Sequence, residues 1–136
     1  MNAPSSSSSS SFEERSFQLC KDILELDAAV VYSCLVDNVG NVIAAEHRDE
    51  APFLERREVE QYVLRMTIAA ALFSNESRMG EMQYSITYRE NVAQLIVPAS
   101  AGSHRLFFLL LVKRDSDTGL LVDEKLIPFI ARSAVL

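Results

Sequence analysis

His47, Asp49 and Glu50 are the side chains whose types and spacing come nearest to acid–base chemistry, because an imidazole beside two carboxylates can polarise a water molecule. A charged loop of this composition is usually solvated surface, so we expect no catalysis there. The serines offer no nucleophile, since none lies in a GxSxG turn between a strand and a helix. We therefore expect a protein that is not an enzyme.

The sequence has no pattern typical of a metal or phosphate site. His47 and His104 are isolated, and Cys20 and Cys34 do not have the spacing of metal ligands. The 4 glycines stand singly, whereas a P-loop or a dinucleotide-binding loop needs them clustered. We expect no cofactor and no metal, and we expect both cysteines to pack as small hydrophobic side chains in a protein from a reducing compartment.

Length and charge limit the class of protein further. The chain has 136 residues, 49% of them hydrophobic, which is enough for one domain with its own core. Its net charge of −6 repels phosphate backbones and anionic lipids, so we expect no nucleic-acid partner. The longest apolar runs, 28–36 and 106–112, are far shorter than the roughly 20 residues that span a bilayer. Without a secretory signal pattern, we expect no membrane insertion and a cytoplasmic location.

The N-terminal segment is unlike the rest of the chain. Residues 1–11 include 7 consecutive serines and no large apolar side chain after Met1, so burial cannot offset the entropy of ordering them. We expect a disordered serine-rich tail at 1–11, followed by one domain at 12–136. Ser11 and Glu14 have the spacing of a capping box, which predicts a first helix from Phe12 to about Leu26.

Segments rich in β-branched and aromatic side chains predict strands. The first two are joined by a turn at 37–41, in which Gly40 can take a positive φ. Residues 82–88 alternate between apolar and polar, which is typical of a strand with one covered face. Pro98 should end the fourth strand, because proline cannot donate to a ladder. The predicted strands are residues 28–36, 42–45, 82–88, 92–97 and 106–112.

Two further helices are predicted from apolar residues three, four and seven positions apart. One covers about 54–77, and its second half is apolar on more than one face. That helix is either sunk in its own core or shared with a second copy of the chain, and both interpretations stay open. The other helix covers about 120–134, where Pro128 predicts a kink or two short segments.

The predicted order is α-β-β-α-β-β-β-α, an α+β fold with a five-stranded antiparallel sheet. Hairpin connections, together with pairing of the two most apolar strands, give the order 2-1-5-4-3. Strand three then has an open edge. Antiparallel pairing with a second copy would close both edges and bring the long helices together. We therefore predict a homodimer, and a dimer or partner interface that includes Tyr62, Met66, Phe73, Met82, Tyr84, Ile86 and Tyr88.

This order of elements resembles the roadblock fold of dynein light chains, itself similar to longin and profilin-like domains. The resemblance covers about 12–134 and is carried by the strand–turn–strand stretch 36–44, the second helix and the segment 118–121. It implies a homodimeric, non-enzymatic adaptor, built through helix two and strand three, which binds or regulates a Ras-like small GTPase. Residues 88–95 and 48–54 also resemble short archaeal proteins of unknown function.

The alternative function is a small-molecule sensor of the PAS or GAF type, in which helices also lie beside an antiparallel sheet. Such a domain needs a pocket with polar groups that orient the ligand. Here the expected sheet interior is filled by Tyr32, Phe107, Phe108 and Leu109. We therefore rank the adaptor first.

Overall fold

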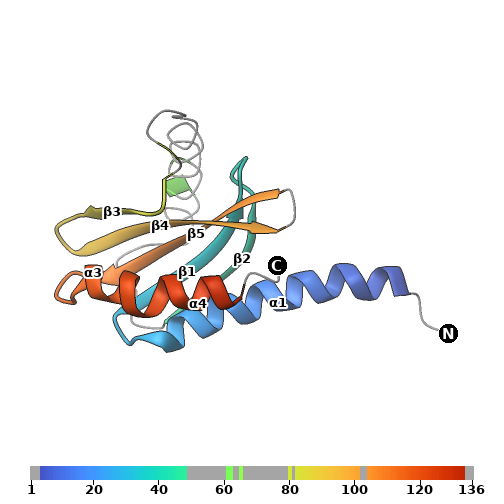
Figure 1. Cartoon of the computed structure of the whole chain (residues 1–136), viewed down its shortest axis with the longest axis horizontal. Helices are drawn as coiled ribbons and strands as arrows, with labels where there is room; N and C mark the ends of the chain where they lie inside the picture. Colours follow the sequence, from blue (N-terminus) through green and yellow to red (C-terminus); the bar gives the residue numbers. More distant parts are fainter. Residues whose placement is uncertain are drawn as a thin grey trace.

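The fold is an antiparallel sheet with helices, seen in a computed structural model that describes residues 4–48, 61, 62, 65, 80, 82–101 and 104–133. The 5-stranded sheet has the order β2-β1-β5-β4-β3, which confirms the predicted order (Figure 1). Its strands are β1 (Val30–Asp37), β2 (Val42–His47), β3 (Ser85–Tyr88), β4 (Val92–Ala101) and β5 (His104–Lys113). Each neighbouring pair is antiparallel.

The first helix, α1, spans Pro4–Leu26. It begins before the predicted start at Phe12, and Ser11 lies inside it, so the predicted capping box is wrong. Serine destabilises a helix by only roughly 0.5 kcal/mol per residue relative to alanine. The serine run can therefore extend toward the N-terminus the helix that the apolar face after it stabilises. The N-terminal part of α1 extends past the sheet (Figure 1). The division into a tail at 1–11 and a domain at 12–136 stays a prediction.

The predicted second helix, 54–77, falls mostly outside the described residues. Within it, Gln61, Tyr62 and Arg65 are described, and all three are helical. The part of the chain that the structure describes contains no helix long and apolar enough to cross a membrane.

The two faces of the sheet are covered differently. One face packs against α1 and the C-terminal helices, which lie on the same side of the sheet (Figure 1). We call it the α1 face; its core includes Cys20, Ile23, Leu35, Leu95, Phe108, Leu110, Val122 and Leu126. The other, which we call the Tyr62 face, carries Cys34, Val36, Ile96, Phe107 and Leu109, and Tyr62 packs there against Val31, Val92 and Leu111. Cys20 and Cys34 are both 0% exposed, which confirms that they are core residues.

β4 runs on through Pro98, which lies opposite Phe107 of β5. The prediction that Pro98 ends the strand is therefore wrong. β3 pairs with β4 only as far as Ile96, so Pro98 lies where β4 has a single neighbour among the described strands. The loss of one donor is tolerated at such an edge.

The C-terminal helix continues without a break through the described residues but changes helix type next to Pro128, and the predicted kink there stays a prediction. It consists of α3 (Thr118–Leu120), the π-helical segment η1 (Leu121–Leu126) and α4 (Ile127–Arg132), with Pro128 in the first turn of α4. The Asp117 side chain accepts a hydrogen bond from the Leu120 amide at 3.1 Å and starts the helix. The Ile127 amide donates to Val122, five residues back, as in a π-helix.

Arg48 closes the junction between α1 and β1. Its Nε donates to the carbonyl of Val30 at 2.7 Å, and its Nη2 donates to the carbonyls of Leu24 and, at 3.4 Å, Asp27. Asp27 in turn accepts from the Ala29 amide and forms an ion pair with Lys125 of η1, Nζ to Oδ2 at 2.8 Å. These contacts fix the end of α1 against the sheet and η1.

Candidate functional site

The candidate site is the outer edge of β3. This strand ends the sheet and pairs with β4 through Ser85–Ile96 and Tyr88–Ala93. Among the described residues, no strand pairs with its other edge. Such an edge presents unpaired backbone donors and acceptors to another chain.

The direction of the backbone groups along β3 follows from the turn after it. The Arg89 amide donates to the carbonyl of Val92 at 2.9 Å, so Arg89 points its backbone groups toward β4. Backbone groups alternate between the two sides of a strand. The N–H and C=O groups of Ile86 and Tyr88 therefore face the open edge.

Side chains of β3 divide between the two faces of the sheet. Ile86 lies opposite Leu95 and Tyr88 opposite Ala93, both of which belong to the α1 face. Tyr84 and Ile86 pack against that core, while Tyr88 remains 53% exposed. The predicted clean alternation of a covered and an exposed side is weaker than expected, because Ser85 and Ile86 are both half-buried.

The other predicted interface residues lie elsewhere. Tyr62 and Met82 pack on the Tyr62 face, so the structure does not bring them together with Tyr84, Ile86 and Tyr88. Burial raises the pKa of the Tyr62 hydroxyl, although the nearby Arg89 partly opposes this. Met66 and Phe73 lie outside the described residues. Whether these seven residues form an interface stays a prediction.

Opposite charges lie near the two ends of β3. At the Tyr88 end, the Arg114 guanidinium stacks 4.5 Å from the centre of the Tyr88 ring, and Arg114 Nε donates to the carbonyl of Arg89 at 3.2 Å. At the other end, Tyr84 Oη donates to Asp123 Oδ1 of η1 at 3.4 Å. Sequence reasoning missed Arg114 and Asp123, since only the folded sheet brings them to β3.

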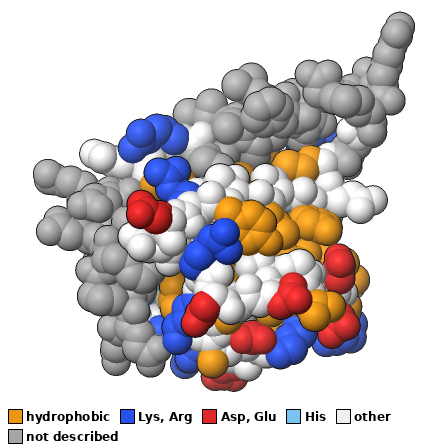
Figure 2. All heavy atoms as spheres, turned by 90° about the vertical axis from the view of Figure 1, so that its left-hand side faces the viewer, with side chains coloured by type: hydrophobic (Ala, Val, Ile, Leu, Met, Phe, Trp, Pro, Cys, Tyr) orange, Lys and Arg blue, Asp and Glu red, His pale blue; other side chains and the backbone are white. Residues whose placement is uncertain are grey.

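Figure 2 shows the side of the molecule on which Figure 1 places the β3–β4 turn. Hydrophobic side chains gather in the middle of this face, with both basic and acidic side chains around them. A mixed rim of this kind around an apolar centre is typical of a protein-binding surface.

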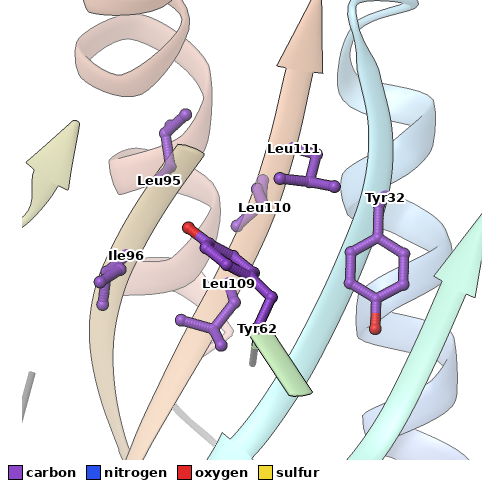
Figure 3. Close-up of a pocket in the computed structure, with 7 residues that line it drawn as sticks. All are labelled: Tyr32, Tyr62, Leu95, Ile96, Leu109, Leu110 and Leu111. Carbon is purple, nitrogen blue, oxygen red and sulfur yellow. The ribbon is translucent and has the colours of Figure 1, made fainter. Parts of the chain in front are cut away.

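A small pocket lies on the Tyr62 face (Figure 3). Its volume is about 10 Å³, close to the least that holds one water molecule. Metabolite pockets measure roughly 300–1,000 Å³. The pocket therefore gives no support to a small-molecule sensor. It is lined by Tyr32, Tyr62, Leu95, Ile96, Leu109, Leu110 and Leu111.

The described side chains include no group of three or more His, Cys, Asp or Glu residues that could hold a metal ion. Burial raises the pKa of Cys20 to about 12 and that of Cys34 to about 11, so both thiols stay protonated and unreactive in the folded protein. His47 is exposed, with Nδ1 3.1 Å from the carbonyl of Arg48. Asp49 and Glu50, predicted to lie near it, fall outside the described residues.

Comparison with known proteins finds solved structures that share this architecture. No protein-family model matches the chain, and no curated protein sequence matches it. Solved structures do match. The MglB of Myxococcus xanthus superposes with a TM-score of 0.69 at 13% identity, covering 90% of this chain and 86% of that one. The gliding protein MglB of Thermus thermophilus gives 0.67 at 18% identity, covering 90% and 84%.

A Roadblock/LC7 domain from Streptomyces avermitilis gives a TM-score of 0.57 at 13% identity, covering 86% of this chain and 93% of that one. The chain has a roadblock fold. This confirms the fold that the strand–turn–strand stretch 36–44 and the order of elements had indicated. The resemblance of residues 48–54 and 88–95 to short archaeal proteins finds no support in these comparisons.

Proposed function

We propose that the protein is a homodimeric, non-catalytic adaptor or regulatory module that binds a protein partner. The observation that carries the proposal is the outer edge of β3, with which no described strand pairs. The backbone groups of Ile86 and Tyr88 are directed outward there, and Tyr88 is 53% exposed. A strand edge of this kind is stabilised by pairing, and pairing with a second copy satisfies both edges at once.

The class of protein partner comes from the fold. The roadblock resemblance implies a Ras-like small GTPase, and the solved structures that share the fold include two MglB proteins. The sequence has no P-loop, so this chain is not expected to bind GTP in that way, and the proposal assigns the nucleotide to the partner. The net charge of −6 favours a partner with a basic surface.

Light scattering coupled to size-exclusion chromatography tests the dimer. The wild-type chain should elute with twice the monomer mass at micromolar concentration, where a standard-size interface persists. Tyr88→Asp should shift the protein to monomer, because the new carboxylate would be placed beside the paired edge. Val39→Asp is the matched control, since Val39 is also exposed, at 65%, but lies on the β1–β2 turn. A monomeric wild-type chain would refute the proposal.

The GTPase is tested separately by binding assays with Ras-like GTPases from the source organism, each loaded with GDP or with a non-hydrolysable GTP analogue. Binding that differs between the two nucleotide states would support a regulatory adaptor. Equal failure of every such GTPase to bind would refute this choice of partner while leaving the dimer in place.

A further inference from the structure

We propose that two copies pair their β3 strands with the two-fold axis at Ile86, so that Arg114 of each copy lies beside Asp123 of the other. This inference rests on the proposed dimer and specifies its register. The charges that set the register lie outside β3 itself, on the segment after β5 and on η1.

The faces of the sheet restrict the register first. In an antiparallel pair, residues directly opposite each other point their side chains to the same face. Ile86 and Tyr88 lie opposite residues of the α1 face, whereas Ser85 lies opposite Ile96 of the Tyr62 face. An even-numbered residue of β3 must therefore face an even-numbered residue of the second copy. The two-fold axis then lies at a residue and not between two.

Backbone direction gives the same restriction. The outward N–H and C=O groups belong to Ile86 and Tyr88, as the Arg89–Val92 hydrogen bond requires. Hydrogen bonds across the dimer therefore join even-numbered residues to each other. An axis at Ser85 would pair Tyr88 with Met82, and an axis at Tyr88 would pair Ile86 with Glu90. In both cases the partner lies outside the strand and little ladder is left. Two registers remain, with the axis at Ile86 or at Thr87.

Charge separates these two registers. With the axis at Thr87, Tyr84 and the neighbouring Asp123 would face Glu90 of the second copy, which brings acidic side chains together. With the axis at Ile86, Tyr84 faces Tyr88. Arg114, which is stacked on Tyr88, then comes beside Asp123 of the second copy, and the symmetry makes this contact twice. Like charges placed opposite each other destabilise a strand pair, so the axis at Ile86 is favoured.

Both charged groups are already held in position. The Arg114 guanidinium is fixed by the Tyr88 ring and by its Nε bond to the Arg89 carbonyl. The Asp123 carboxylate is held by the hydrogen bond that Tyr84 Oη donates to its Oδ1. Little side-chain entropy is then lost when the two groups meet, which increases the value of the contact.

Cysteine cross-linking tests the register. Directly opposed, hydrogen-bonded residues of antiparallel strands have Cα atoms about 5.5 Å apart, within the range that a disulfide bridges. Ile86→Cys should therefore form a covalent dimer on mild oxidation, and Thr87→Cys, whose partner would be Ser85, should not. The native cysteines do not interfere, because both are 0% exposed. Cross-linking of Thr87→Cys in preference to Ile86→Cys would overturn the register.

Charge reversal tests the contact. Arg114→Asp and Asp123→Arg should each raise the dimer dissociation constant by about tenfold, because each change acts at both ends of the interface. The double variant should recover most of the wild-type affinity. Glu25→Arg, an exposed reversal on α1, is the matched control and should change nothing. Thermal melts of each variant establish that it is folded.

The outcomes separate the two proposals. A wild-type chain that stays monomeric refutes the dimer and the register together. A stable dimer in which neither reversal weakens assembly, or in which the double variant is weaker than either single one, refutes the Arg114–Asp123 contact and leaves the proposed dimer intact.

Discussion

Replacing Arg48 by methionine should destabilise the protein by about 2 kcal/mol. Methionine keeps much of the length of the side chain but removes every donor. Arg48 is half-buried and donates to three carbonyls, of Leu24, Asp27 and Val30, at the junction of α1 and β1. The bond to Asp27, at 3.4 Å, is long and contributes little.

The magnitude follows from the two remaining bonds. Each is charge-assisted and contributes about 1.5 kcal/mol net, and the positive charge at the C-terminal end of α1 adds roughly 0.5 kcal/mol through the helix dipole. Water can reach part of this junction and replace some of the lost donors, which reduces the total to about 2 kcal/mol.

Urea unfolding followed by circular dichroism measures the loss. The midpoint should fall while the m-value stays constant, because the surface exposed on unfolding does not change. Arg48→Lys keeps the charge but cannot reach the Val30 and Leu24 carbonyls together, so it should recover less than half of the loss. Lys21→Met, at an exposed position on α1, is the control and should stay within about 0.5 kcal/mol of wild type. If Arg48→Met were as stable as this control, the hydrogen bonds of Arg48 would not contribute to the free energy of unfolding, and the reasoning would be refuted.

Three further predictions concern single groups. Burial by itself would raise the pKa of Asp37, but hydrogen bonds from Asn41 and Val39 outweigh it and hold this pKa below its ordinary value of 3.8. The ionised Asp37 carboxylate therefore stabilises the fold above pH 3.8, and this stabilisation is lost as the pH falls through the folded pKa. Asp37→Ala should therefore cost about 1 kcal/mol at neutral pH and progressively less in acid-unfolding assays. A thiol reagent should label neither Cys20 nor Cys34 in the native protein and both in urea, because both are buried. Lys125→Met should cost under about 1 kcal/mol in thermal melts, since the ion pair with Asp27 is partly exposed.

The order of the strands could be predicted because it depends on properties that a sequence displays directly. β1 and β5 are the most apolar segments, and the structure pairs them from Val30–Val112 to Asp37–Leu106. The turn at 37–41 was equally visible, and Gly40 does take a positive φ, of 93°. Patterns of this kind are local, and the fold follows from placing the most apolar strands in the middle of the sheet.

The helix start and the contacts around β3 could not be predicted. The start of α1 at Pro4 depends on a serine run whose composition is compatible with either helix or coil. In the sequence, Arg48 is typical of the beginning of a polar connection. Its acceptors are backbone carbonyls 18 to 24 positions earlier, and a backbone carbonyl cannot be recognised from the type of its side chain. Asp123 reaches Tyr84 across 39 positions, and only the folded arrangement of η1 over the sheet brings the two together.

The alternation in residues 82–88 correctly placed Tyr84, Ile86 and Tyr88 on one face of the sheet but was wrong for Met82, and it could not show which face that is. The structure puts Ile86 and Tyr88 opposite residues of the α1 face, while Met82 packs on the Tyr62 face. A dimer through β3 would therefore be held by backbone at its centre and by different side chains above and below. Tyr84 and Ile86 also pack in the core of their own chain, so aspartate there would disturb folding and assembly together. Tyr88 and Arg114 are exposed, and assembly can be measured at these two positions without that ambiguity.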